Sequence, residues 1–249
     1  MKTFGLIGHR LGYSFSRNFF TEKFRNENLP DHQYVNFELD SIDEFPGIFD
    51  QYENLGGLNC TIPYKQQIMS FLDEIDAEAA QIGAVNTVKI TTQNGRRHLK
   101  GFNTDIYGFE NSLRPMLEEK HKKALILGTG GASKAIKHIL HKLNIDFVSA
   151  SIEDQLFEKE IRYDQITKEL LKDYLIVIHA TPIGTFPNVD QCPDIPYQGL
   201  TPDHVLFDLV YNPEETLFLK KGKEQGAKTK NGLEMLHLQA IRAWEIWNA

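Results

Sequence analysis

The sequence predicts an α/β protein with two lobes, the second built on a doubly wound parallel sheet. Strand-like and helix-like segments alternate along the chain. Three of the strand-like segments, 123–127, 175–178 and 205–209, are apolar except for Lys123 and Asp208, as strands covered on both faces are. The first of them leads through Gly128-Thr129-Gly130-Gly131 into an amphipathic helix. This strand, turn and helix form the clearest unit in the chain.

The composition excludes several classes of protein. Among 249 residues, Lys and Arg number 27 and Asp and Glu number 34, a formal net charge of −7. A nucleic-acid-binding surface needs clustered positive charge, so nucleic acid is not an expected partner. No stretch approaches the roughly 18 apolar residues of a membrane span, and the N-terminus lacks the apolar run of a signal peptide. We therefore expect a cytoplasmic protein with no membrane partner.

The two cysteines indicate neither a metal site nor a disulfide. Cys60 and Cys192 stand alone, without a CxxC pair or a nearby His at the spacing of metal ligands. In a reducing compartment both are expected to be free thiols.

The first lobe alternates short strands and helices. Apolar spacing predicts strands at 3–7, 34–39 and just before Asn59, with helices at 16–28, 42–52, 65–72 and 76–82. Segments 87–92 and 97–102 flank an Asn-Gly pair, the turn signal of a β-hairpin.

The second lobe begins with a helix near 105–119, and its sheet includes a further strand at 145–150. The helix after the glycine turn has a continuous apolar stripe. A last helix, 233–247, is expected to pack back on the first lobe. The predicted domains are therefore 1–104 plus 233–249, and 105–232, with a ligand cleft between them. Segment 185–203 is expected to be irregular.

The glycine-rich turn is the strongest local indication of a ligand. Gly128 opens a tight turn, and Gly130 and Gly131 allow the backbone to approach a ligand closely. The next helix directs free N–H groups at the same point, where a pyrophosphate is the natural occupant. Glycines also serve turns for steric reasons alone, so the prediction of a dinucleotide site depends on the strand and helix around them.

The end of the second strand of this lobe bears on the choice of cofactor. An acid there binds the ribose 2′-OH of NAD, whereas an Arg accepts the 2′-phosphate of NADP. The strand ends in Ser151-Ile152-Glu153-Asp154, which contains two acids and no Arg. Read alone, this favours NAD, with Lys134 as a candidate phosphate contact.

Polar clusters in the first lobe mark candidate substrate residues. Ser14 and Ser16 precede a helix, where two hydroxyls and helix amides suit a carboxylate; the alternative is a simple N-cap. Pro63 makes the connection from Asn59 to Lys65 rigid. Each cluster also has a structural reading, a surface lysine for Lys65 and a helix cap for Asp105.

In combination and in this order, the motifs resemble the shikimate dehydrogenase family along the whole chain. The resemblance implies an N-terminal α/β substrate-binding domain and a Rossmann-like dinucleotide-binding domain. It implies a reaction that needs no metal ion. The matching residues are Ser14/Ser16, Asn59/Thr61/Lys65, Asn86, Asn103/Asp105, Gly128 to Ala132, Ala180 to Gly184, Asp208 to Thr216 and Asn231 to Ala240.

The family's activity is the reversible NADPH-dependent reduction of 3-dehydroshikimate to shikimate, a step of the shikimate pathway towards chorismate and the aromatic amino acids. The resemblance implies an acid–base pair of Lys65 and Asp105. It implies substrate contacts from Ser14, Ser16, Thr61, Asn86, Tyr211 and Gln239. It implies cofactor contacts from Gly128, Thr129, Gly130, Gly131, Ala132, Ser133, Ser151, Thr181, Leu209, Gly232 and Met235.

The sequence departs from the family pattern at four places. The Asn-Arg-Thr/Ser common after the second strand is Ser151-Ile152-Glu153 here, which leaves NAD open beside NADP. Arg17 follows the two serines where Pro is usual, His179 replaces Asn before Ala-Thr-Pro, and Thr185 stands where Met is common. None of these changes removes a catalytic group.

Three other functions remain alternatives at this stage. The first is an NAD-dependent quinate/shikimate dehydrogenase, favoured by the missing Arg. The second is a catalytically idle sensor of a dinucleotide or a shikimate-like ligand, against which the Lys65/Asp105 pair argues. The third is a two-lobed dehydrogenase of the folate type, which would lack the Ser14/Ser16 site. The sequence leaves both a monomer and a homodimer open, since it contains no exposed apolar stripe or heptad pattern that would indicate an oligomer interface.

Overall fold

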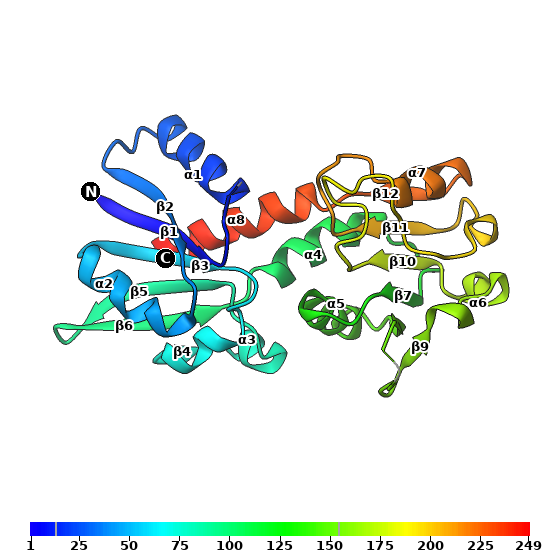
Figure 1. Ribbon diagram of the computed structural model, residues 1–249, viewed down its shortest axis with the longest axis horizontal. Coiled ribbons are helices and arrows are strands. Elements are labelled where there is room, and N and C mark those ends of the chain that lie inside the picture. The colour runs from blue at the N-terminus through cyan, green and yellow to red at the C-terminus, as the bar shows by residue number, and fades with distance from the viewer. Residues whose placement is uncertain (13, 154) are drawn as a thin grey trace. The chain divides into compact units, whose positions relative to one another are not determined.

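The computed structural model describes residues 1–12, 14–153 and 155–249, which form two compact units (Figure 1). Unit 1 comprises Met1–Asp105 and Gln239–Ala249, and unit 2 comprises Ile106–Leu238. Each unit contains a six-stranded sheet with helices packed on it. The predicted α/β class is therefore confirmed.

The sheet of unit 1 is mixed, with strand order β2-β1-β3-β5-β6-β4. Its first three strands run parallel, and β5 and β6 form the predicted antiparallel hairpin. The strands are β1 (Lys2–Gly8), β2 (His32–Glu38), β3 (Leu55–Cys60), β4 (Glu74–Ile75), β5 (Thr87–Gln93) and β6 (Arg96–Phe102).

Helices cover both faces of this sheet. On one face, α1 (Phe15–Asn26) and the end of α8 (Leu233–Asn248) pack aromatic side chains around Phe4. A Cβ on Gly57 of β3 would lie 2.2 Å from the Trp247 ring, so the helix sits directly on the strand. The last helix thus packs on the first lobe as predicted. The other face is covered by α2 (Ile48–Gln51), α3 (Ala77–Ile82) and the 3₁₀ segments Ile42–Gly47 and Gln67–Phe71.

The sheet of unit 2 is parallel throughout its described pairs, with order β12-β11-β10-β7-β8-β9. Numbered along the unit, this is the order 3-2-1-4-5-6 of a Rossmann fold, with the reversal between β7 and β10. The strands are β7 (Lys123–Leu127), β8 (Asp146–Ser151), β9 (Glu160–Arg162), β10 (Ile176–His179), β11 (Val205–Asp208) and β12 (Lys228–Lys230). The predicted doubly wound sheet is confirmed.

Both faces of this sheet are also covered. α6 (Lys168–Asp173) and α7 (Leu217–Glu224) pack on one face. α4 (Asp105–Leu113) lies on the other, where the rings of Phe109 and Phe207 meet at 5.2 Å. α5 (Gly131–Lys142) follows the glycine turn, and 3₁₀ turns lie at Arg114–Met116, Tyr163–Gln165 and Tyr197–Gly199.

Three predicted helices differ from the structure. Segment 42–52 is a 3₁₀ turn followed by one turn of α-helix, because Pro46 lacks the N–H that a continuous helix needs. Segment 65–72 is a 3₁₀ turn that begins only at Gln67. The helix predicted at 105–119 ends at Leu113, where a 3₁₀ turn containing Pro115 takes over.

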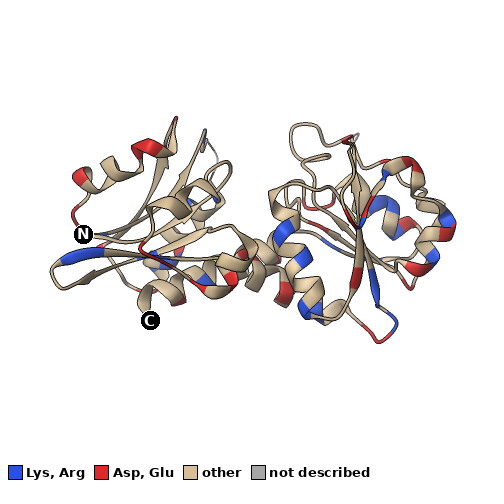
Figure 2. Ribbon diagram, turned by 90° about the horizontal axis from the view of Figure 1, so that it is seen from below, with Lys and Arg blue, Asp and Glu red and all other residues tan. Residues whose placement is uncertain are grey.

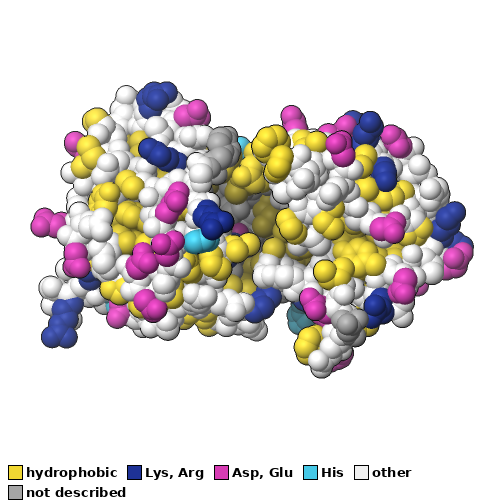
Figure 3. Space-filling view, in the orientation of Figure 1, with side chains coloured by type: hydrophobic (Ala, Val, Ile, Leu, Met, Phe, Trp, Pro, Cys, Tyr) yellow, Lys and Arg dark blue, Asp and Glu magenta, His cyan; other side chains and the backbone are white. Residues whose placement is uncertain are grey.

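Acidic and basic residues are mixed along the chain of each unit (Figure 2). The face in Figure 3 likewise carries both signs of charge between apolar side chains, unlike the clustered positive charge of a nucleic-acid surface. In the described part of the chain, no helix is both long and apolar enough to cross a bilayer.

Candidate active site

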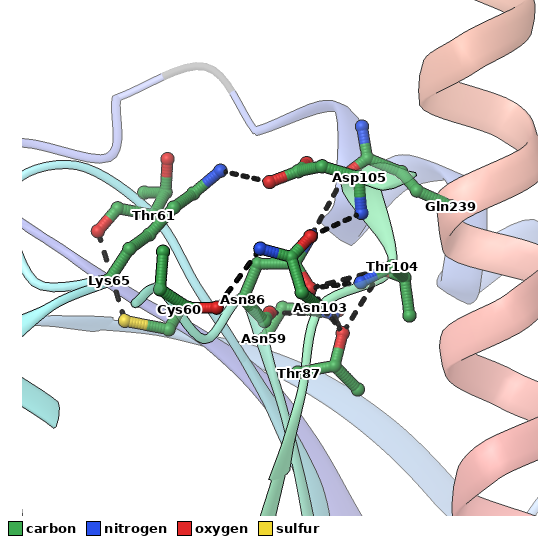
Figure 4. A network of polar contacts seen from close by, with 11 residues as sticks. Asn59, Cys60, Thr61, Lys65, Asn86, Thr87, Asn103, Thr104, Asp105 and Gln239 are labelled. Atoms are coloured by element: carbon green, nitrogen blue, oxygen red, sulfur yellow. Dashed lines mark hydrogen bonds and ion pairs between the residues drawn. The ribbon is translucent and has the colours of Figure 1, made fainter. Parts of the chain in front are cut away.

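Three strand ends of unit 1 meet at one edge of its sheet and carry Thr61, Asn86 and the Lys65/Asp105 pair (Figure 4). Asn59 of β3 pairs with Thr87 of β5, which in turn pairs with Phe102 of β6. The chain leaves or enters the sheet here at residues 61, 86 and 103. This register, set by residues far apart in sequence, brings the side chains of Asn59, Asn86, Thr87 and Thr104 into one polar network.

Lys65 and Asp105 form an ion pair at this edge. Lys65 Nζ donates to Asp105 Oδ2 at 2.8 Å, and the side chains are 28% and 14% exposed. The Lys65 carbonyl accepts from the Val85 N–H at 2.7 Å. Asn103 Oδ1 accepts from the Asp105 N–H at 3.1 Å, while its Nδ2 donates to the Ala84 carbonyl. Asn103 thus supplies the helix-capping contact, and Asp105 is left to pair with the lysine.

Asn86 is held in one orientation by its neighbours. Its Oδ1 accepts from the backbone N–H of Thr104 at 2.7 Å and from the hydroxyls of Thr104 and Thr87 at 3.2 and 3.1 Å. Three donors fix that atom as the oxygen, so Nδ2 donates, reaching Gln239 Oε1 at 3.3 Å. Asn86 and Gln239, predicted from separate motifs, therefore belong to one site.

The polar side chains of Tyr34 and Asn59 extend this network through Thr87. Tyr34 Oη donates to Asn59 Oδ1 at 2.7 Å, and Asn59 Nδ2 donates to the Thr87 hydroxyl at 3.2 Å. Burial raises the pKa of Tyr34, while a hydrogen bond with Ser16 opposes the rise. Sequence reasoning missed Tyr34, Thr87 and Thr104, because their roles arise from strand register and carry no local motif.

Ser14 and Thr61 lie where chain segments leave the parallel strands. Ser14 is buried and caps α1, its Oγ accepting from the Arg17 N–H at 3.2 Å, as the simpler reading anticipated. The hydroxyl proton of a cap that accepts in this way is still available to a ligand. The Thr61 N–H donates to the Ile7 carbonyl at 2.9 Å, which anchors it beside the end of β1.

The glycine turn of unit 2 lies at the carboxyl end of β7, beside the reversal of strand order. Gly128 has φ +110°, and a Cβ there would lie 2.7 Å from Thr181 Cγ2, so only glycine suits the position. A Cβ on Gly130 or Gly131 would meet nothing within 4 Å. The space in front of the turn is therefore open.

The amides at the start of α5 are available to an anion. Gly130 is the N-cap, and no side chain caps the helix. The Ser133 hydroxyl donates to the Gly130 carbonyl at 2.6 Å, which keeps the turn in shape. Open space, a left-handed glycine and uncapped amides fit the diphosphate of a dinucleotide. Thr129 and Ala132 belong to the same turn.

The end of β8 provides few polar groups for a 2′-phosphate. Ser151 is buried, and its Oγ accepts from the Glu153 N–H at 3.1 Å. Ile152 and Glu153 are exposed. Asp154, the second acid of this segment, lies outside the described residues.

The remaining predicted cofactor residues lie in unit 2, and two of them, Leu209 and Gly232, adjoin one another. A Cβ on Gly232 would lie 2.2 Å from the Leu209 carbonyl oxygen, so these two residues are in direct contact. Met235 is buried, and its carbonyl oxygen would lie 2.4 Å from a Cβ on Gly108. Tyr211 also belongs to unit 2, whereas the other predicted substrate residues belong to unit 1.

Known proteins resemble this chain over almost its whole length. Residues 6–88 match the family model of the shikimate dehydrogenase substrate binding domain. A shikimate dehydrogenase (NADP(+)) of Desulforamulus reducens is 36% identical, with 98% of this chain and 88% of that protein aligned.

Solved structures extend the likeness to the fold. A shikimate dehydrogenase solved in complex with NADP+ is 34% identical, with a TM-score of 0.80 over 99% of this chain and 90% of that one. A quinate dehydrogenase from Corynebacterium glutamicum in complex with NAD is 26% identical, with a TM-score of 0.85 over 99% and 93%. Identity and fold together confirm the resemblance, and the chain belongs to the shikimate dehydrogenase family.

Proposed function

We propose that this chain is an oxidoreductase that reversibly reduces 3-dehydroshikimate to shikimate with NADPH, within the biosynthesis of chorismate and the aromatic amino acids. The observation that carries the proposal is the Lys65–Asp105 ion pair, 2.8 Å long and built into the polar edge of unit 1. The full-length likeness to shikimate dehydrogenase (NADP(+)) supports the choice of reaction and of cofactor.

Lys65 acts as the acid and base of the reaction. NADPH, when bound, would supply the hydride for the carbonyl carbon of the substrate. The Lys65 ammonium stabilises the negative charge that develops on the carbonyl oxygen and donates its proton there. In the reverse direction the neutral amine accepts the proton of the hydroxyl. Asp105 orients the ammonium and accepts from a substrate hydroxyl, so no metal is required.

The polar residues of unit 1 bind the substrate. Ser14 and Ser16 donate to its carboxylate at the start of α1, where helix amides add positive potential. Thr61, Asn86 and Gln239 contact its hydroxyls. Because Asn86 and Gln239 are already joined by a hydrogen bond, they present one fixed pattern of donors and acceptors. Tyr211 completes the predicted set of substrate residues.

Unit 2 holds the cofactor. The turn from Gly128 to Ser133 binds the diphosphate, and Ser151 at the end of β8 faces the adenosine ribose. Thr181, Leu209, Gly232 and Met235 lie along the nicotinamide side. Unit 1 is then the substrate-binding domain and unit 2 the dinucleotide-binding domain. The cytoplasmic location and a homodimer stay predictions beside this assignment.

Initial rates test the proposed function. Shikimate and quinate would each be oxidised with NADP+ and with NAD+, following the absorbance of the reduced nicotinamide. We expect the shikimate–NADP+ pair to have the highest kcat/KM. A preference for NAD+ would mean that the exposed Glu153, after β8, selects the free ribose hydroxyl of NAD+. Turnover of quinate would then distinguish a quinate/shikimate dehydrogenase from a shikimate dehydrogenase. The absence of turnover with every pair would refute the proposal.

A further inference from the structure

A buried chain of hydrogen bonds runs beneath the cofactor side of unit 2. His179 and Asp208 are the last residues of β10 and β11, they pair in register, and both side chains are 0% exposed. His179 Nδ1 lies 3.0 Å from Asp208 Oδ1. That carboxylate also accepts from the Val210 N–H at 2.9 Å and from the Thr216 hydroxyl at 2.5 Å.

The partners of the carboxylate determine where the histidine proton lies. An Asp208 side chain that accepts from Val210 and Thr216 is an acceptor for the ring as well, so His179 Nδ1 carries the proton. Nε2, 2.5 Å from Thr181 Oγ1, is then the acceptor of the Thr181 hydroxyl proton. Thr181 Oγ1 in turn accepts from the Ile183 N–H at 3.3 Å. In this arrangement each of these donors, His179 Nδ1–H, the Thr181 hydroxyl and the Ile183 N–H, has one acceptor.

Thr181 connects this chain of hydrogen bonds to the glycine turn. Its Cγ2 would lie 2.7 Å from a Cβ on Gly128, and the N–H of Ala180 donates to the Leu127 carbonyl at 2.9 Å. The methyl group therefore faces the first glycine of the turn while the hydroxyl is tied into the core. The buried His179 side chain, which a ligand cannot reach, therefore fixes the position of residues 181–183 beside the turn.

We propose that His179 is a positioning residue for the dinucleotide: acting through the Thr181 hydroxyl, it holds the segment 181–183 at the place where the bound nicotinamide nucleotide needs it. The inference rests on the proposed function. It concerns a residue at which this chain departs from the Asn common in the family. The imidazole ring joins two partners, Asp208 through Nδ1 and Thr181 through Nε2.

Substitutions at three positions separate positioning from simple packing. His179→Leu removes both contacts. His179→Gln retains an amide oxygen at about the reach of Nε2, and so restores the acceptor for Thr181. Thr181→Val keeps the methyl group and removes the hydroxyl. The matched control is His204→Leu, because His204 is equally buried in unit 2, hydrogen-bonds through both ring nitrogens, and precedes β11 at the opposite end of the strand.

The readout is the dissociation constant of NADP+, measured by calorimetry on the full chain, beside the thermal midpoint of each variant. We expect about a tenfold weaker Kd for His179→Leu and for Thr181→Val, the effect of one unsatisfied buried group. The double variant should bind no more weakly than either single one, since both remove the same interaction. His179→Gln should bind within about threefold of the wild type, and His204→Leu should lower the midpoint without changing Kd.

Three results of the binding measurements would overturn the inference. They are an unchanged Kd in His179→Leu, additive effects in the double variant, or an equal loss of affinity in His204→Leu. Ring nitrogen chemical shifts give an independent check, and a proton found on Nε2 of His179 would also overturn it. If the wild type binds neither NADP+ nor NAD+, the proposed function fails with it; wild-type binding with unaffected variants rejects the positioning role alone.

Discussion

The ammonium of Lys65 and the carboxylate of Asp105 lie 2.8 Å apart although 40 residues separate them in the sequence. One residue follows β3 and the other begins α4, and each is fixed through its own backbone by a neighbouring loop. The pair is therefore positioned before any substrate arrives.

Removing the ammonium should affect the chemical step far more than substrate binding. We expect Lys65→Met to lower kcat by about 10²- to 10⁴-fold, since general acid–base catalysis contributes about that much. The shikimate KM should change little in comparison. Lys100→Met is the matched control, because Lys100 pairs with Glu74 on the edge strand and has no place in the site. Near wild-type turnover by Lys65→Met with saturable shikimate would rule out the assigned role.

The contact of Gly57 with Trp247 should make Gly57→Ala destabilising. The new Cβ would lie 2.2 Å from the indole ring, which must move although its Nε1 donates to the Val88 carbonyl at 3.1 Å. We expect a loss of about 1–3 kcal/mol in the free energy of unfolding, measured with urea. Gly47→Ala is the control, since nothing lies within 4 Å of its added Cβ and its φ is −66°. Equal stability of the two variants would contradict the contact.

Acid should weaken one ion-pair cluster of unit 2. Hydrogen bonds from Lys228 and Lys120 lower the pKa of Glu118 to about 2. A carboxyl whose folded-state pKa is depressed stabilises the fold above its unfolded value, and the contribution is lost as the pH falls through the folded value. The difference in thermal midpoint between wild type and Glu118→Gln should therefore shrink between pH 4.5 and about 2.

The exposed neighbour Glu119 provides the comparison for this titration. Glu119→Gln should show a midpoint close to that of the wild type at every pH in the window. A pH-independent difference for Glu118→Gln would mean that the two lysines do not act through the carboxylate charge.

The two thiols should differ in reactivity. Burial raises the pKa of Cys60 to about 12, although the nearby Lys65 charge opposes the rise. Cys192 is half-buried, and Lys221 Nζ lies 3.3 Å from its Sγ. With iodoacetamide near neutral pH, mass spectrometry should find Cys192 alkylated first and Cys60 only after urea is added. Faster labelling of Cys60 in the folded protein would contradict its burial.

The elements that could be predicted are those with local signals. In the strand Lys123–Leu127 every residue after the lysine is apolar and a glycine turn follows, and the hairpin of β5 and β6 has its Asn-Gly pair. The short strands Glu160–Arg162 and Lys228–Lys230 could not be predicted, because they are polar and lie at the two edges of the sheet. An edge strand has one neighbour and needs no continuous apolar run.

The site divides in the same way. The glycine turn was predictable from its residues, whereas Lys65 and Asp105 were singled out only through the resemblance to a family. Spacing alone favoured a helix cap for Asp105, and the structure gives that role to Asn103. The links among Tyr34, Asn59 and Thr87 depend on which strands are neighbours. Such pairings are absent from any short stretch of sequence.

Unit 1 is assembled from two separate stretches of chain, and this affects its synthesis. Phe4, Phe20 and their aromatic neighbours are synthesised long before Trp247, against which they pack. During this interval an apolar face of the sheet is open to water and to other nascent chains. We therefore expect shortened chains that lack the end of α8 to expose this face and to aggregate.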